Sequence, residues 1–152
     1  MGAERNTSVV MRFLAAFPFL AMTAFCLPPT SSSAAPSISA GSSHVLAVRS
    51  DGRVLAWGND DRGELGQGQT IQSSVPIAIN AAPSFTAIAA GHEHVLALTA
   101  SGTVYAWGRN PDGELGDGTR ADRAEPMAVP GLGDVVAIAA GWSYSLAVKR
   151  DG

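Results

Sequence analysis

Cysteine is nearly absent from this sequence, since the single one, Cys26, lies in an apolar stretch near the N-terminus. One cysteine supports neither a disulfide framework nor a thiolate metal site. A basic excess is missing as well, because 10 Lys and Arg stand against 13 Asp and Glu, for a formal net charge of −3. A chain of this charge would be repelled by a phosphate backbone, so the composition argues against nucleic-acid binding.

The sequence also lacks an apolar run long enough to cross a membrane. Its longest run, residues 13–27, is interrupted by Pro18 and is shorter than the roughly 18 apolar residues that a spanning helix needs. Arg5 and Arg12 precede this run, and small and helix-breaking residues follow it. This is the layout of a secretory signal peptide. We therefore expect residues 1–34 to be a signal peptide on a secreted or extracytoplasmic protein with no membrane span.

Several details of the N-terminus stay open at this point. Cleavage after Ala34 suits the small residues around it, but cleavage after Ala35 and a true start at Met11 are alternatives. Acylation of Cys26 would give a lipid-anchored protein, although the bulky Phe25 stands where a lipoprotein signal wants a small residue. A cytoplasmic protein with an apolar N-terminal tail is the third alternative.

Glycine and proline are abundant, and they mark a repeat. The 17 glycines and 9 prolines favour many turns and β structure over long helices. The stretch VLAWGNDDRGELGQG at residues 54–68 returns as VYAWGRNPDGELGDG at residues 104–118. Two copies of 50 residues align without a gap and share 20 identities. The pattern predicts a linker at 35–37, repeat 1 at 38–87, repeat 2 at 88–137 and a partial repeat 3 at 138–152.

Within one copy the sequence predicts four short strands, which in repeat 2 are expected at 85–91, 94–100, 103–108 and 125–130. Apolar residues in these runs are nearly continuous, which is typical of sheets covered on both faces. No segment has a convincing helical period, so stacked copies of the same sheet must supply the cover, as in a β-propeller. Small residues such as Ala47, Ala56, Ala97 and Ala106 would let sheets approach closely, with tryptophans filling the wider gaps.

The motifs themselves carry a family resemblance. The order Gly-x-x-His-x-Leu-Ala-Leu, Gly-x-Val-Tyr-Ala-Trp-Gly and Gly-Glu-Leu-Gly-x-Gly resembles the regulator of chromosome condensation repeat, and Tyr144 is a departure from the histidine seen at His44 and His94. The resemblance implies an all-β fold of four-stranded antiparallel propeller blades, here part of a seven-bladed propeller, and protein recognition through the rim loops. Members of this family include guanine-nucleotide exchange factors for a nuclear GTPase, and secreted propellers that resemble the repeat include inhibitors of β-lactamases.

Most residues of the motifs are expected to serve the architecture. The glycines of the Gly-Glu-Leu-Gly-x-Gly loops are expected to adopt positive φ, and the leucines are expected to pack into the core. No helix is expected to follow these loops, so they do not predict phosphate sites. The structural residues of the repeat are Gly41, His44, Trp57, Gly58, Gly63, Leu65, Gly66, Gly91, His94, Trp107, Gly108, Gly113, Leu115, Gly116 and Gly141.

One rim of the predicted propeller is the candidate binding surface. In an antiparallel meander the first and third connections of each blade share a face, and these loops differ between the copies. The candidate rim residues are Asp60, Asp61, Arg62, His92, Glu93, Arg109, Asp112 and Trp142. Trp142 is the most suggestive, because an aromatic side chain on a rim can anchor a protein partner, although it can equally pack on the neighbouring blade.

The polar residues of the motifs do not predict a metal site or catalysis. Acidic residues of the loops, among them Asp60, Glu64 and Glu114, lack the spacing of a calcium loop and are expected to be solvated. His44 and His94 are expected to be buried and hydrogen-bonded between blades. No nucleophile elbow, metal triad or Ser/His/Asp arrangement stands outside the repeat, so no cofactor is implied and an enzyme is not expected.

The sequence thus predicts an exported, non-enzymatic propeller module for protein binding or scaffolding. The alternatives are a regulator of a small GTPase, a secreted enzyme inhibitor, and a structural segment of a larger surface protein. Seven repeats of this length would need about 350 residues, and arrays need at least about three repeats to bury a continuous core. We therefore expect a fragment of a longer propeller, or a chain that self-associates to complete one.

Overall fold

The computed structural model describes residues 35–79 and 82–152, and every described element is a β-strand. The predicted signal peptide and the lipid-anchor alternative at Cys26 lie outside the described residues. Within them, no helix is long and apolar enough to span a membrane. The strands are β1 (Ser37–Ala40), β2 (His44–Val48), β3 (Val54–Gly58), β4 (Ser73–Ala78), β5 (Phe85–Ala90), β6 (His94–Thr99), β7 (Val104–Gly108), β8 (Arg123–Ala128), β9 (Val135–Ala140) and β10 (Ser145–Lys149).

These strands form three antiparallel sheets in which each strand pairs with its neighbour in sequence. The first sheet has the order β1-β2-β3-β4, the second β5-β6-β7-β8, and the third is the pair β9 and β10. Register repeats with the sequence, because Val45 pairs with Trp57 in the first sheet and Val95 pairs with Trp107 in the second. The predicted all-β fold of four-stranded antiparallel blades is confirmed; the last strand of the second sheet begins at Arg123, two residues earlier than expected.

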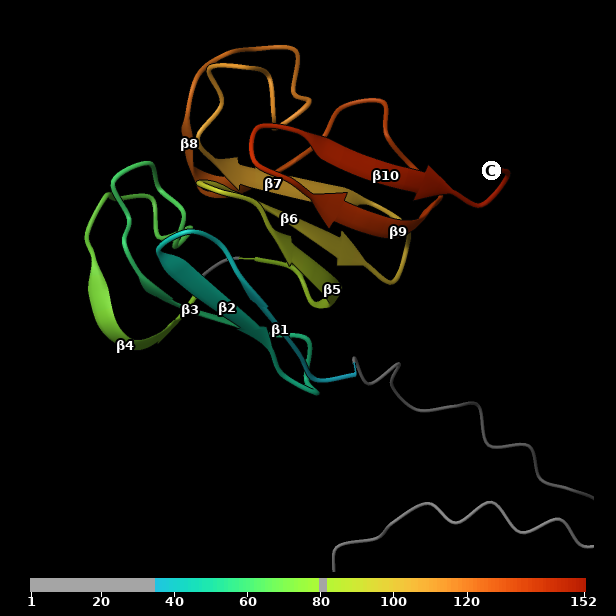
Figure 1. The fold of residues 1–152 in the computed structure, drawn as a ribbon. Helices are drawn as coiled ribbons and strands as arrows, with labels where there is room; N and C mark the ends of the chain where they lie inside the picture. The colour runs from blue at the N-terminus through green and yellow to red at the C-terminus, as the bar shows by residue number, and fades with distance from the viewer. Residues whose placement is uncertain (1–34, 80–81) are drawn as a thin grey trace, which may run out of the picture. The chain divides into compact units, whose positions relative to one another are not determined.

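The sheets stack face to face, as Figure 1 shows for the region around β2, β5 and β9. One apolar cluster lies between the first and second sheets and includes Leu46, Leu65, Phe85 and Trp107. A second cluster lies between the second and third sheets and includes Leu96, Leu115 and Val135. Both faces of the second sheet are therefore buried, which explains why its strands are apolar almost without interruption.

The long β3–β4 and β7–β8 loops fold in the same way. Their glycines, predicted to need positive φ, have it: the values are 86°, 66° and 75° for Gly63, Gly66 and Gly68. Leu65 and Leu115, the predicted plugs, are 0% and 2% exposed. A leucine side chain can enter the core only because the chain reverses at these glycines, a conformation that costs other residues more. The repeated loop is thus an architectural unit.

Candidate protein-binding rim

The loops that were predicted to share one rim do lie beside one another. The β1–β2 turn is tied to the β5–β6 turn by a hydrogen bond from the Ser42 amide to the His92 carbonyl, at 3.1 Å, and the His92 amide donates in turn to the Gly141 carbonyl, at 3.2 Å. The β7–β8 loop joins this row where the Arg109 amide donates to the Glu93 carbonyl, at 2.8 Å. Backbone bonds therefore hold loops from three sheets in one continuous rim.

An aromatic pair marks the rim over the third sheet. Trp142 lies in the β9–β10 turn with 69% of its surface exposed. The His92 ring stacks on its indole, with centroids 3.7 Å apart and planes 23° from parallel. Stacking fixes one face of the indole against the second sheet, while its other face remains exposed. Trp142 thus satisfies both sequence interpretations, since it packs on the neighbouring sheet and still presents an aromatic surface.

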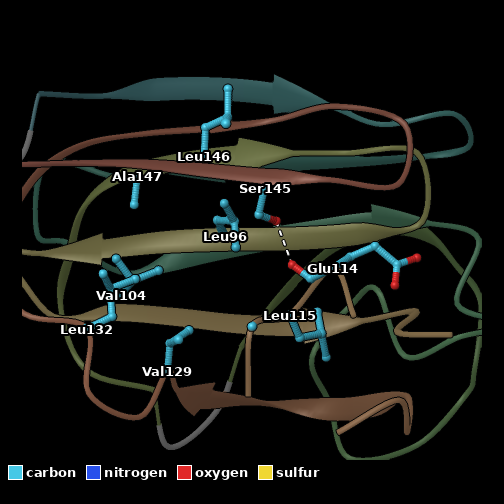
Figure 2. A pocket seen from close by; sticks show the side chains of 10 residues that line it. Leu96, Val104, Glu114, Leu115, Val129, Leu132, Ser145, Leu146 and Ala147 are labelled. Atoms are coloured by element: carbon cyan, nitrogen blue, oxygen red, sulfur yellow. Dashed lines mark hydrogen bonds between the residues drawn. The ribbon is translucent and has the colours of Figure 1, made fainter. Parts of the chain in front are cut away.

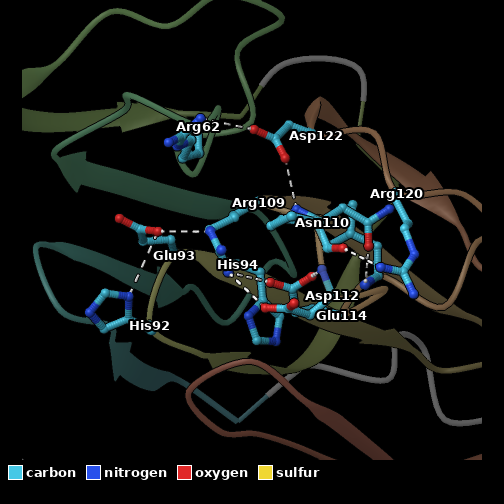
Figure 3. Close-up of polar contacts among 12 residues, drawn as sticks. Arg62, His92, Glu93, His94, Arg109, Asn110, Asp112, Glu114, Arg120 and Asp122 are labelled. Atoms are coloured by element: carbon cyan, nitrogen blue, oxygen red, sulfur yellow. Dashed lines mark hydrogen bonds and ion pairs between the residues drawn. The ribbon is translucent and has the colours of Figure 1, made fainter.

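Next to this pair, Arg109 gathers three carboxylates, as Figure 3 shows. Its guanidinium is 2.8 Å from Glu114, 3.3 Å from Glu93 and 3.4 Å from Asp112. Only 27% of the Arg109 side chain is exposed, and its pair with the almost fully buried Glu114 lies within the β7–β8 loop, whereas its pair with Glu93 ties this loop to the β5–β6 turn. Hydrogen bonds between ionised groups are stronger than those between neutral groups. Glu93 and Asp112 leave oxygens facing solvent.

A second charged group connects the first two sheets. The Arg62 guanidinium lies 3.5 Å from the Asp122 carboxylate, which also accepts the amide of Asn110 at 2.8 Å. Asp61 is exposed beside them, and its carboxylate accepts the side-chain amide of Asn59 at 3.1 Å. Arg62 and Asp61 therefore present opposite charges on the outer part of the rim.

Asp60 does not belong to the accessible rim, and the prediction that it does was wrong. Its side chain is 0% exposed, and its carboxylate accepts the amides of Leu65 and Ile71, each at 2.9 Å. Asn110 occupies the same place in the second sheet, where its side-chain oxygen accepts the Leu115 amide at 3.0 Å. An Asp or Asn at this position serves as the internal hydrogen-bonding centre of the loop, so it cannot contact a partner.

The other loop acids were also expected to be solvated, and for two of them this was wrong. Glu64 is 1% exposed and accepts the Arg62 amide, and Glu114 is 3% exposed and accepts the Asp112 amide. Burial raises the pKa of Glu64, and burial likewise raises the pKa of Asp60, against the lowering effect of their amide donors. Asp117 behaves differently: although burial opposes it, hydrogen bonds from Thr119, Arg123 and Asn110 hold its pKa at about 2.

The Gly-x-x-His motif places a ring beneath a glycine. A Cβ on Gly91 would lie 2.2 Å from the Cε1 atom of His94, so only glycine leaves room for the imidazole. His94 is 1% exposed, and its Nε2 atom lies 3.0 Å from the Ser145 hydroxyl of the third sheet. The predicted hydrogen bond between blades is thus confirmed for His94.

For His44 that prediction was wrong. The ring is buried to the same degree, but within the described residues neither of its nitrogens has a hydrogen-bond partner. The position equivalent to Ser145 is Val95, which carries no hydroxyl. Burial, followed by the charges of His94 and His92, lowers the pKa of His44 to about 4. His44 is therefore neutral at pH 7.

The polar partners of the rim were largely missed by the sequence interpretation. Glu114, Asp122 and Ser145 contact Arg109, Arg62 and His94, yet none of the three was among the predicted structural or rim residues. One signal was available, because the exchange of Asp60 for Asn110 between copies keeps an acceptor oxygen and so indicates a structural role. In the described ranges, no group of three or more His, Cys, Asp or Glu residues is placed to hold a metal ion.

Known proteins resemble the chain in both sequence and fold. The ultraviolet-B receptor UVR8 of Arabidopsis thaliana is 48% identical over 44 residues, which are 29% of this chain and 10% of the receptor. Protein pim1 of Schizosaccharomyces pombe is 63% identical over 30 residues, which are 20% of this chain and 6% of pim1. The chain thus spans a tenth or less of these two relatives.

Two solved structures have the same fold over most of the described residues. Human WBSCR16 superposes with a TM-score of 0.68 at 27% identity, over 75% of this chain and 31% of its own. Prp20p of Saccharomyces cerevisiae, whose structure was reported with its binding to Gsp1p and histones, superposes with a TM-score of 0.67 at 22% identity, over 80% of this chain and 33% of its own. The chain spans about a third of each.

Family models match the repeats themselves. The model described as the regulator of chromosome condensation (RCC1) repeat matches residues 51–98 and 101–148, and a second model of the same repeat matches residues 37–64 and 85–114. The first match alone covers more than half of the sequence. Its two copies begin 50 residues apart, which is the length of the repeat. The chain therefore belongs to the regulator of chromosome condensation repeat family.

Proposed function

We propose that this chain is an exported, non-enzymatic module that binds a protein partner through the rim formed by the β1–β2, β5–β6 and β9–β10 turns and the two long loops. The observation that carries the proposal is the exposed indole of Trp142, held in place by the His92 ring at 3.7 Å. Tryptophan is enriched among the residues that dominate protein interfaces, and a side chain fixed before binding loses little entropy on association.

The charges around this indole support recognition of a protein surface with polar groups of both signs. Arg62 and Asp61 are exposed, and Glu93 and Asp112 keep solvent-facing oxygens while paired with Arg109. Such a polar surround is typical of the edge of an interface, where charges set orientation and association rate more than affinity. The proposed contact surface therefore has Trp142 as its anchor, with Glu93, Asp112 and Arg62 along the same rim.

A photo-crosslinking experiment tests this surface. A photoreactive amino acid at position 142 is expected to capture the partner, and the same group at Ser101, in the β6–β7 turn at the other ends of the strands, serves as the matched control. Trp142→Ala is then expected to weaken binding of the captured protein at least about tenfold, the effect of an interface anchor. Equal capture from both positions, or unchanged affinity of the variant, would refute the rim as the binding surface.

Export rests on the sequence of residues 1–34 and needs its own test. The chain is expected to appear outside the cytoplasm with Ala35 as its first residue, as read by mass spectrometry of the N-terminal peptide. Deleting residues 13–27, the apolar run, is expected to retain it inside the cell. An intact N-terminus on cytoplasmic protein would refute export while leaving the rim proposal standing.

Binding of a small GTPase is a second candidate, favoured by the similarity to Prp20p, which was studied for its binding to Gsp1p. The two candidates differ in place and in activity. Cytoplasmic retention together with accelerated nucleotide release from a GTPase would favour the second. Export without such activity would favour the extracytoplasmic binding module.

A further inference from the structure

Four Asp-Gly pairs occur in the sequence, and this dipeptide is chemically labile. They are Asp51–Gly52, Asp112–Gly113, Asp117–Gly118 and Asp151–Gly152. The amide nitrogen that follows an aspartate can attack the side-chain Cγ atom and close a succinimide ring, and glycine has no side chain to obstruct the attack. The reaction needs a side chain that can leave its contacts and a carboxyl that becomes protonated. The surroundings of each aspartate therefore decide where it occurs.

Asp112 lies in the β7–β8 loop beside Arg109, as Figure 3 shows, and its carboxylate is weakly held. Its side chain is 55% exposed, and the Arg109 guanidinium lies 3.4 Å from it. Arg109 is closer to two other carboxylates, at 2.8 and 3.3 Å. The Gly113 amide donates to the Asn110 carbonyl at 3.2 Å, which is at the long end for such a bond. Both reacting groups are therefore loosely held.

The exposure of Asp112 belongs to its place in the loop. Arg62 occupies the same place in the first repeat, where the neighbouring Gly63 packs against Ala124 of the second sheet. The Arg62 side chain is nevertheless 52% exposed. The Gly63 amide also makes a long bond, at 3.3 Å to the Asp60 carbonyl. The residue before this glycine therefore faces solvent even where another sheet covers the loop.

Asp117 lies in the same loop and is firmly held. Its side chain is 10% exposed, and its Oδ2 atom lies 3.0 Å from the Arg123 guanidinium. Its Oδ1 atom accepts the amide and the hydroxyl of Thr119, at 2.9 and 2.7 Å. Burial alone would raise the pKa of Asp117, but hydrogen bonds from Thr119, Arg123 and Asn110 hold it at about 2. Near neutral pH its carboxyl is thus protonated roughly 60-fold less often than one with the ordinary pKa of 3.8.

The Asp51 carboxylate, in the β2–β3 turn, has a partner for each oxygen. Its Oδ1 atom accepts the Arg53 amide at 3.1 Å, and its Oδ2 atom lies 3.3 Å from the Arg49 guanidinium. The Gly52 amide donates to the Arg49 carbonyl at 2.9 Å, a shorter bond than the one that Gly113 makes. Ring closure is therefore less favourable in this turn than in the β7–β8 loop.

We propose that Asp112–Gly113 is a site of spontaneous isomerisation to isoaspartate. The Gly113 nitrogen bonds to the Asp112 Cγ atom, and the carboxyl OH leaves with the amide proton as water. Water then opens the ring. If it breaks the bond from this nitrogen to the Asp112 backbone carbonyl carbon, the chain continues through Cγ as isoaspartate; if it breaks the new bond, aspartate returns. The water lost in ring closure is regained in hydrolysis, so no co-reactant is consumed.

Isoaspartate would change the rim around Arg109. It adds one carbon to the main chain between two tied points. At one, the Arg109 amide donates to the Glu93 carbonyl at 2.8 Å; at the other, the Glu114 carbonyl accepts the Ser145 hydroxyl at 2.7 Å, as Figure 2 shows. The added carbon lengthens the turn that the Gly113 amide closes, and the free carboxylate then branches from Cα. This site goes beyond the proposed binding function and does not rest on it.

The test uses the 152-residue chain, incubated near neutral pH and digested with trypsin at intervals. Cleavage after Arg109 and Arg120 gives the peptide NPDGELGDGTR, residues 110–120, which holds both pairs of the loop. Electron-transfer fragmentation locates isoaspartate within it. Isoaspartate at Asp112 is expected to rise with time and to exceed that at Asp117 at least about tenfold, because protonation already favours an ordinary carboxyl by more than this factor.

Two controls separate the effect of the fold from that of the dipeptide. The synthetic peptide of residues 110–120 carries both pairs without the fold, and isoaspartate is expected at both positions at comparable rates. The variant Asp112→Glu keeps the charge beside Arg109 but would have to close a larger ring, so it is expected to remove the modified species.

Three results would overturn the proposal. Equal isoaspartate at Asp112 and Asp117 in the intact chain would show that the structure does not select between them. An intact chain without isoaspartate at Asp112, while the synthetic peptide isomerises, would show that the loop protects this pair. More isoaspartate at Asp51 than at Asp112 would assign the reaction to the β2–β3 turn.

Discussion

The two interfaces between the sheets are built from corresponding residues, yet they are filled differently. Between the first and second sheets, Trp107 occupies the space over Leu65 and donates to the Glu64 carbonyl. Between the second and third sheets, Leu115 and the Glu114 carbonyl border an open cavity, and that carbonyl accepts the Ser145 hydroxyl. Trp107 therefore fills at the first interface a space that is open beside β10.

The histidines of the two interfaces also differ, and here the hydrogen bond is found at the second interface. His94 reaches Ser145 across the second interface, whereas the residue equivalent to Ser145 at the first is Val95, and His44 has no hydrogen-bond partner among the described residues. The second interface thus has the better satisfied polar group. Repeats of one sequence pattern can therefore distribute packing and hydrogen bonding differently at each contact.

The largest expected effect comes from Trp107→Ala, which makes the first interface resemble the second. Removing a fully buried indole is expected to lower the free energy of unfolding by about 3–5 kcal/mol, measured by denaturant titration followed by circular dichroism. Trp142→Ala is the matched control, because that indole is 69% exposed, and its effect is expected to stay within about 0.5 kcal/mol. Equal losses for both variants would contradict the buried role of Trp107.

Gly91→Ala probes the ring beneath the glycine at the second interface. The new Cβ would lie 2.2 Å from His94, so the imidazole must leave its place, at a cost of about 2–3 kcal/mol. Gly133→Ala is the control, since no atom lies within 4 Å of a Cβ there. Chemical denaturation compares the two variants. If Gly91→Ala costs no more than the control, then the close approach does not explain the motif.

Acidification is expected to weaken the first interface through His44. Its pKa is about 4 in the folded protein, below the ordinary histidine value of 6.5, so between these values the unfolded state binds more protons. The stability from a neutral His44 is complete above pH 6.5 and is lost as the pH falls toward 4, with about 2 kcal/mol lost by pH 5.

The difference in the free energy of unfolding between the unmodified chain and His44→Gln isolates the contribution of His44. Burial raises the pKa values of Asp60 and Glu64, which works in the opposite direction as the pH falls, but both groups are present in both proteins. Unfolding is measured from pH 7.5 to 4.5. Parallel stability curves for the two proteins would show that His44 does not titrate with a lowered pKa.

Ser145→Ala makes the second interface resemble the first in hydrogen bonding. Because it removes a single hydrogen bond, it is expected to have the smallest effect on the free energy of unfolding. His94 Nε2 would lose its partner at 3.0 Å, which costs about 1–2 kcal/mol for a buried group. Ser143→Ala, in the adjoining turn, is the control. A double variant with His94→Ala decides the mechanism, since the cost of Ser145→Ala should largely disappear when the imidazole is already absent.

Much of this architecture could be predicted from the sequence. The strands, the positive φ of loop glycines such as Gly63 and the burial of Leu65 and Leu115 follow from the 50-residue period, because two aligned copies must fold alike. The rim could be predicted too, since turns alternate between the two ends of an antiparallel meander. Trp142 lies exposed in the β9–β10 turn of this rim, and its role in binding a partner stays a prediction.

The site chemistry was predictable only in part. Asp60 and Glu64 are acidic residues in a glycine-rich loop, which usually indicates solvent exposure, yet both turn inward to accept backbone amides. No feature of the local sequence distinguishes an inward carboxylate from an outward one, apart from the exchange of Asp60 for Asn110. Whether His44 finds a partner likewise depends on a residue 51 positions away, as it does for His94 and Ser145.

The sequence by itself determined the repeat, the strand order and the glycine turns, because these depend on periodicity and on the local conformation of the backbone. Only the tertiary structure decided which acids are buried and which histidine is hydrogen-bonded. These properties depend on contacts between neighbouring sheets, where one substitution such as Ser145 for Val95 changes the partner of a residue far away in the chain.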